Sequence, residues 1–144
     1  MAMLSPTASP VATLKLASTL AETRRLHAWL DDVLSQSALP DSVAQAVRIC
    51  LEEAVTNVVL HGYGQDSPGP IELTLGPAPP GLLAVIVDRA PPFDPTQVPV
   101  LPPPTDLHSG RLGGHGLRLI HRFASVFRYE RAAGQNRLTL GFAV

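Results

Sequence analysis

Four short apolar segments of the sequence come in two pairs, and each pair is joined by residues that favour turns. Residues 71–75 and 82–87 are joined by Gly-Pro-Ala-Pro-Pro-Gly, and residues 125–130 and 137–142 are joined through Ala-Gly-Gln-Asn at 133–136. Short segments separated in this way predict β-hairpins. Because the strands cluster in hairpins with few helices between them, the sequence favours an α+β fold over a doubly wound parallel sheet.

The other regular segments predict one more strand and three helices. Residues 11–17 alternate between the two faces of a short strand. Residues 20–35 and 41–60 have helical periodicity, and a shorter helix covers 117–123. We therefore expect a two-layer α/β sandwich, in which helices cover one face of a mixed, mostly antiparallel sheet.

The chain has 144 residues, 45% of them apolar, which suits one folded domain at 11–144 after a flexible arm at 1–10. A formal net charge of -1 gives no electrostatic footprint for nucleic acid or an anionic membrane. The start lacks the basic region of a signal peptide, Pro6 and Pro10 interrupt it, and no later segment reaches the length of a membrane span. The single cysteine, Cys50, lies in an apolar helical run and is expected to be an inert core thiol. We expect a cytoplasmic protein without direct contact to nucleic acid or membrane.

Three polar residues interrupt the apolar helical run. Glu53, Asn57 and His61 are spaced by four and so lie along one line of the helix. One interpretation is a solvated edge of an amphipathic helix. The other is chemical, because an Asn oxygen suits Mg²⁺ and a carboxylate one turn earlier could accept a proton. His61 could simply brace the helix end, and we do not expect it to be catalytic.

Two later segments offer parts that complement this line. Asp88 follows an apolar strand, where its carboxylate could accept a hydrogen bond from an exocyclic amine, or could be an ordinary strand-end Asp. Residues 113–116, Gly-Gly-His-Gly, lead into a helix, where backbone N–H groups could approach phosphates, or could form a plain capping loop. Between them runs a Pro-rich stretch from Pro91 to about Gly110, and a loop this long in a small domain often covers a site.

In this order, the three segments resemble the GHKL, or Bergerat-type, ATP-binding fold. Residues 53–63 (EAVTNVVLHGY) look like its N box, residues 88–95 (DRAPPFDP) like its G1 box, and residues 114–117 (GHGL) like its G2 box. More narrowly, the first two stretches are similar to the bacterial anti-sigma factor serine-protein kinases of the RsbW type. The resemblance extends over residues 11–144.

This resemblance implies ATP and Mg²⁺ as cofactors. It implies that Glu53 is the catalytic base, that Asn57 is the Mg²⁺ ligand, and that Asp88 reads adenine. The loop at 95–113 would be the ATP lid, and Arg111 within it is a candidate to reach the γ-phosphate. The boxes assign these residues to the nucleotide: Asn57, His61, Asp88, Ala90, Phe93, Gly113, Gly114, His115, Gly116 and Leu117.

The implied reaction is transfer of the γ-phosphoryl group to a serine of an anti-anti-sigma antagonist protein. Members of the family also sequester a sigma factor, commonly as a homodimer, and release it when the unphosphorylated antagonist competes. Such catalysis consists mostly of positioning and charge neutralisation.

The sequence departs from the family pattern in two places. Ala90 stands where a glycine is usual, so its methyl group would crowd a base slightly and would disfavour a positive φ. Gly134-Gln135-Asn136 stands where Gly-Thr is common, so a hydroxyl near Asp88 is expected to be missing. Both changes bear on nucleotide affinity.

Other members of the superfamily fit less well. Sensor histidine kinases need a helical phosphoacceptor domain upstream, whereas about fifty residues precede Glu53 here. Gyrase- and chaperone-type ATPases couple to domains that this chain lacks. An alternative of another class is a non-catalytic anti-sigma module with a degenerate nucleotide site, which Ala90 leaves open and the presence of Glu53 and Asn57 opposes.

Overall fold

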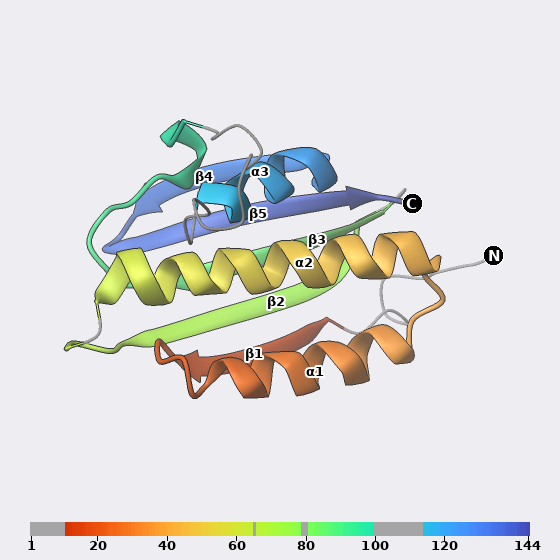
Figure 1. The fold of residues 1–144 in the computed structure, drawn as a ribbon, viewed down its shortest axis with the longest axis horizontal. Helices are drawn as coiled ribbons and strands as arrows, with labels where there is room; N and C mark the ends of the chain where they lie inside the picture. Colours follow the sequence, from red (N-terminus) through yellow and green to blue (C-terminus); the bar gives the residue numbers. More distant parts are fainter. Residues whose placement is uncertain (1–10, 65, 79–80, 100–113) are drawn as a thin grey trace, which may run out of the picture.

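The computed structural model describes residues 11–64, 66–78, 81–99 and 114–144, and in it strands and helices form two layers (Figure 1). The sheet has the order β1-β2-β3-β5-β4, and each neighbouring pair is antiparallel. The predicted α+β sandwich is confirmed, and the described sheet is antiparallel throughout rather than mixed. The strands are β1 (Ala12–Ala17), β2 (Pro70–Ala78), β3 (Gly81–Asp88), β4 (Val126–Ala132) and β5 (Gln135–Ala143).

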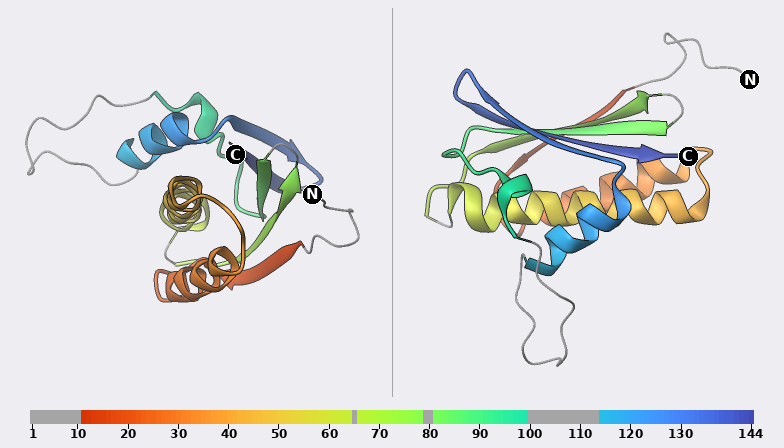
Figure 2. Two further views of the ribbon diagram at one scale, coloured as in Figure 1. Left: turned by 90° about the vertical axis from the view of Figure 1, so that its right-hand side faces the viewer. Right: turned by 90° about the horizontal axis from the view of Figure 1, so that it is seen from above.

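The helices lie on one side of the sheet, as the view from above shows (Figure 2). They are α1 (Thr23–Ser35), α2 (Asp41–Asn57) and α3 (Gly114–Phe123). A π-helical turn, Val58–Tyr63, continues α2, and a short 3-10 turn, Pro95–Gln97, follows β3. Among the described helices none is long and apolar enough to cross a membrane.

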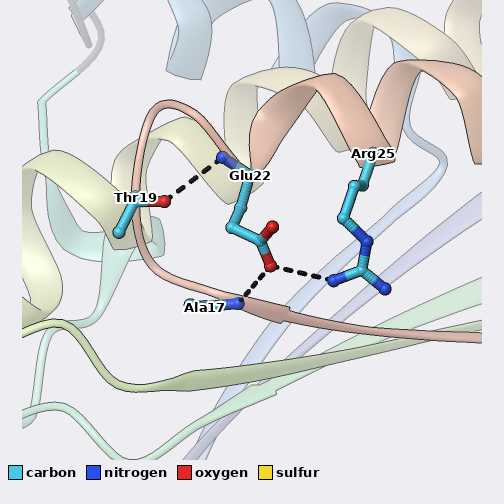
Figure 3. Close-up of polar contacts among 4 residues, drawn as sticks. All are labelled: Ala17, Thr19, Glu22 and Arg25. Atoms are coloured by element: carbon cyan, nitrogen blue, oxygen red, sulfur yellow. Dashed lines mark hydrogen bonds and ion pairs between the residues drawn. The ribbon is translucent and has the colours of Figure 1, made fainter.

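Helix α1 begins at Thr23 and not near Leu20, because side chains hold residues 18–22 in a turn (Figure 3). The hydroxyl of Thr19 accepts a hydrogen bond from the Glu22 N–H at 3.2 Å. The Glu22 carboxylate accepts from the Ala17 N–H at 3.1 Å and from the Arg25 guanidinium at 2.8 Å. The hydrogen bond from Ala17, followed by that from Arg25, lowers the pKa of Glu22. Thr19 therefore caps this turn and not the helix itself.

The core lies between the helices and the inward face of the sheet. Inward residues alternate along β2, β3 and β5, as the period of a strand requires. Cys50 on α2 is fully buried, and burial, together with the charge of Glu53, raises the pKa of its thiol to about 12. The interpretation of Cys50 as an inert core thiol is confirmed. The largest fully buried side chains are Leu26, Leu30, Leu51, Ile71, Leu73, Ile86, Ile120 and Leu140.

Two predicted turns have different outcomes. Ala133 and Gly134 join β4 to β5 with φ values of 54° and 74°, the two positive values that a type I′ hairpin turn requires. The turn therefore begins at Ala133 but is shorter than predicted, since Gln135 and Asn136 already belong to β5. The first and last residues of the predicted turn at 76–81 belong to β2 and β3, and the two residues between these strands, 79–80, lie outside the described residues, as does the predicted flexible arm at 1–10.

Candidate functional site

A pocket opens where the end of α2, the end of β3 and the start of β5 come together. These three ends lie at the left of Figure 1. The space between the walls of the pocket, open solvent included, is about 440 Å³. Its walls are mostly apolar with a few polar groups, which is the usual composition of a ligand site. The lining residues are Ala54, Asn57, Val58, Gly62, Ile86, Asp88, Phe93, Pro95, Ile120, Tyr129, Asn136 and Leu138.

Asn57 is the last residue of α2 and lines this pocket. Its side chain is 4% exposed, and within the described part of the chain its buried Nδ2 has no hydrogen-bond partner. A buried amide donor without a partner costs about 1–3 kcal/mol. An unpaired polar atom in a pocket wall is therefore a group available to a ligand. The chain leaves α-helical geometry directly after it, and π-helical turns occur often at functional sites.

Glu53 lies one helical turn before Asn57 and is half-buried. It does not line the pocket itself. Burial raises the pKa of its carboxyl group, and the negative charge of the neighbouring Glu52 raises it further. Glu52 in turn pairs with the imidazole of His27 on α1. Because its pKa is raised, the Glu53 carboxylate is a stronger proton acceptor than a carboxylate in free solution.

Asp88 and Asn136 are polar residues at inward positions of two neighbouring strands. They face each other directly in the β3–β5 register and are 6% and 5% exposed. The Asn136 Nδ2 donates to Asp88 Oδ1 at 2.8 Å, and the Ala90 N–H donates to the same oxygen at 2.9 Å. Hydrogen bonds to a charged acceptor are among the stronger ones in proteins. The carboxylate is therefore firmly held in the pocket wall.

Asn136 supplies a polar partner for Asp88 at the place where the sequence predicted that a hydroxyl is missing. The hydroxyl expected from a Gly-Thr pair is absent, but the Asn136 amide occupies a position beside the carboxylate. Tyr129 on β4 donates its hydroxyl hydrogen to the amide oxygen of Asn136. Neither Asn136 nor Tyr129 was assigned to the site from sequence, because their contacts depend on the strand register.

Ala90 is placed differently from what the sequence suggested. Among the described residues, Ala133 is the only non-glycine residue with positive φ, so Ala90 does not adopt the backbone that would require glycine. Ala90 is 1% exposed and does not line the pocket. Its Cβ instead lies 3.3 Å from where a Cβ on Gly62 would be, so the methyl group packs behind the pocket wall. A Cβ at position 62 would therefore require a shift of a few tenths of an ångström between these two residues.

Tyr63 ties the end of the π-helical turn to the strand ends. Its hydroxyl donates to the Pro70 carbonyl at 2.7 Å and accepts from the Arg89 N–H at 2.7 Å. Burial is the main cause that raises the pKa of this phenol. The sequence included Tyr63 in the N box without giving it a role. The structure places it next to the backbone that carries Asp88.

Phe93 and His61 lie near each other. Phe93 lines the pocket, and its ring centroid is 6.1 Å from that of the exposed His61. His61 belongs to the π-helical turn, one turn beyond Asn57. Of the three polar residues predicted to lie along one line, Glu53 is therefore half-buried, Asn57 is buried and His61 is exposed. Of these three, only Asn57 lines the pocket.

The glycine-rich segment is helical sooner than expected. Helix α3 begins at Gly114, so the first residues of the G2-like stretch form the first turn of the helix and do not precede it. The first N–H groups of a helix have no partner within it, so this position remains suited to an anion. Leu117 is buried in the core, and Ile120 one turn later lines the pocket.

Part of the predicted lid is described. The Asp94 carboxylate accepts from the Thr96 N–H at 2.9 Å and so caps the 3-10 turn that contains the pocket residue Pro95. The rest of the segment, at 100–113, lies outside the described residues, and with it the candidate residues Arg111 and Gly113.

The chain matches known proteins over most of its length. The histidine kinase-like ATPase domain family matches residues 16–142. A serine/threonine-protein kinase, BtrW, from Bordetella bronchiseptica is 31% identical over 128 residues, which is 89% of this chain and 90% of that protein. The crystal structure of the RsbU and RsbW domains of Rv1364c from Mycobacterium tuberculosis is similar in fold, with a TM-score of 0.65 and 24% identity. That match covers 93% of this chain and about a third (32%) of the other.

Proposed function

Because this chain belongs to the histidine kinase-like ATPase domain family, we propose that it is an ATP-dependent protein serine kinase of the anti-sigma type. It transfers the γ-phosphoryl group to a serine of an anti-anti-sigma antagonist, and it sequesters a sigma factor until the unphosphorylated antagonist competes. It works in the cytoplasm as a homodimer. The similarity to a serine/threonine-protein kinase over nine-tenths of both chains supports the kinase part of this proposal.

One observation supports the nucleotide site above all others. Asn57 and Asp88, from different elements of the fold, are both buried and both line one pocket. A fold gains no stability from two adjacent buried polar groups of which one has no partner. A ligand with a hydrogen-bond donor at one end and phosphates at the other accounts for both residues. The exocyclic amine of adenine would meet Asp88, and the phosphates would extend toward Asn57 and the start of α3.

Glu53 is the group we assign to proton transfer. It accepts the proton of the antagonist's serine hydroxyl as the oxygen attacks the γ-phosphorus. A general base works best when its pKa is near the working pH, and burial moves the pKa of Glu53 in that direction. Its position one helical turn before Asn57, the residue that we propose meets the phosphates, supports this role.

The residues present fit Mg²⁺ through a single protein ligand. Within the described ranges no group of three or more His, Cys, Asp or Glu side chains could hold a metal. Mg²⁺ usually takes one or two protein oxygens and completes its shell with phosphates and waters. The ligand would be the side-chain oxygen of Asn57, which lines the pocket. Its Nδ2 is a donor and would instead face a phosphate oxygen. When bound, Mg²⁺ would neutralise charge on the phosphates.

Phosphorylation of the cognate antagonist with labelled ATP tests the proposal. We compare wild type with Glu53→Gln and Asn57→Ala, and use Glu72→Gln as a matched control, since Glu72 is an exposed carboxylate on β2. The proposal predicts transfer by wild type and the control, and losses of roughly 100-fold or more in the other two variants. Equal transfer by all four proteins would refute the assigned residues.

The non-catalytic alternative is tested by the same assay. It predicts sigma factor binding without any phosphoryl transfer by wild type. The feature that favoured it was Ala90, and the backbone there needs no glycine.

A further inference from the structure

The Asn136 amide has its orientation fixed by its surroundings. On one side lie three acceptors, Asp88 Oδ1 at 2.8 Å and the carbonyl oxygens of Ala90 and Pro91, each at 3.2 Å. On the other side the Tyr129 hydroxyl donates to Oδ1. A flipped amide would place its oxygen against three acceptors, so Nδ2 must face Asp88. Both N–H groups of the amide are thereby engaged, and its Nδ2 has no hydrogen left for a ligand.

This arrangement makes the two oxygens of Asp88 different. Oδ1 accepts from the Asn136 Nδ2 and from the Ala90 N–H. No donor from the described residues reaches Oδ2, and Asp88 lines the pocket. The pocket therefore has one oriented acceptor at this point, and the carboxylate cannot rotate without losing both hydrogen bonds.

We propose that Asn136, oriented by Tyr129, is the positioning residue that fixes Asp88 so that its Oδ2 selects a base with an exocyclic amine over a 6-oxo base. The proposal rests on the nucleotide site described above and deepens it. An adenine amine donates to Oδ2, whereas the O6 of hypoxanthine would place an acceptor against an acceptor. Once a base covers Oδ2, leaving this acceptor unpaired discriminates strongly, because water no longer replaces the lost hydrogen bond.

Arg131 on β4 also helps to hold the backbone next to Asp88 in place. It lies opposite Asn136 in the β4–β5 register, and its guanidinium donates to the Ala90 carbonyl at 2.7 Å. The backbone that carries Asp88 is thus held by side chains from the β4–β5 hairpin. Positioning therefore comes from a part of the chain more than forty residues away from Asp88 in sequence.

The test measures dissociation constants for ATP and ITP by calorimetry with Mg²⁺ present. The variants are Asn136→Leu, Asn136→Thr and Tyr129→Phe, and the control is Arg128→Gln, an exposed neighbour of Tyr129. We expect Asn136→Leu to weaken ATP binding roughly tenfold or more, and Tyr129→Phe roughly three- to tenfold, with ITP binding changed less than about twofold. Asn136→Thr keeps a donor for Asp88 and should stay within about threefold of wild type.

A double-mutant cycle separates positioning from direct contact, because Tyr129 also lines the pocket. If Tyr129 acts through the Asn136 amide, Tyr129→Phe should change ATP affinity little once position 136 is threonine. An undiminished effect in that background would overturn the proposal, and so would equal losses for ATP and ITP, which indicate a general structural defect. Either result leaves ATP binding by wild type intact. If wild type binds neither nucleotide, the proposed function and this inference both fail.

Discussion

Replacing each of the chain's two asparagines by alanine should change the stability of the fold in opposite directions. Asn57 and Asn136 are buried to nearly the same extent, at 4% and 5% exposure. The Asn57 Nδ2 has no partner in the described structure, whereas the Asn136 Nδ2 donates to Asp88 and to two carbonyl oxygens. Truncation to alanine therefore removes an unpaired Nδ2 at position 57 and a hydrogen-bonded Nδ2 at position 136.

The magnitudes follow from these contacts. In Asn57→Ala, removing a buried unpaired donor gains about 1–2 kcal/mol. Alanine's higher helix propensity adds about 0.5 kcal/mol, and lost packing subtracts about 1 kcal/mol. The variant should be about 1 kcal/mol more stable than wild type. Asn136→Ala loses a hydrogen bond to a charged acceptor and should be about 2–3 kcal/mol less stable.

The assay is urea unfolding without nucleotide and with EDTA present, because a ligand that binds only the folded state would add its own stabilisation. Midpoints are compared at equal slope, so that the difference reports stability alone. If Asn57→Ala lost more than about 1 kcal/mol, as expected of a satisfied buried amide, Asn57 would be a structural residue. The reasoning that its amide is kept for a ligand would then be wrong.

Three further changes test other contacts. Glu53→Gln should raise stability at pH 7, because burial raises the pKa of Glu53 and its ionisation therefore costs stability above the folded-state pKa. The gain should disappear below pH 4.5, the ordinary pKa of the group, where Glu53 is protonated in both the folded and the unfolded state. Thermal unfolding measured across this pH range would contradict us if the gain persisted below pH 4.5. Tyr63→Phe removes the hydrogen bonds to Pro70 and Arg89 and should cost about 1–2 kcal/mol in urea unfolding; a loss under about 0.5 kcal/mol would mean that water replaces both. Cys50 is fully buried with a pKa of about 12, so a thiol reagent should label it only as the chain unfolds, and immediate labelling of the native protein would refute its placement.

The fold was largely predictable because its signals are local. Each hairpin is set by a turn between two alternating segments, and α2 is set by a long apolar stripe. The beginning of α1 was wrong by three residues, since the side chains of Thr19 and Glu22 bind backbone groups in a turn instead. The periodicity of apolar residues, on which the helix was predicted, does not show such side-chain-to-backbone hydrogen bonds.

The site was predictable only in part. Asn57 and Asp88 were found because each sits at a recognisable position, a polar residue on an apolar helix and an acid at a strand end. Asn136 was missed because its partner is 48 residues away in sequence, and only the β3–β5 register brings the two together. The sequence also left open whether the backbone at Ala90 needs a glycine, and the structure shows that it does not.

The central claim is that the pocket between α2, β3 and β5 binds ATP. Titration of Mg-ATP into ¹⁵N-labelled protein, followed by two-dimensional NMR, tests it directly. We predict saturable shifts of the Gly62 and Ala90 backbone amides and of the Asn136 side-chain amide, while the β1 amides of Ala12–Ala17 stay unchanged. The absence of saturable shifts, or shifts confined to β1 and α1, would contradict the account.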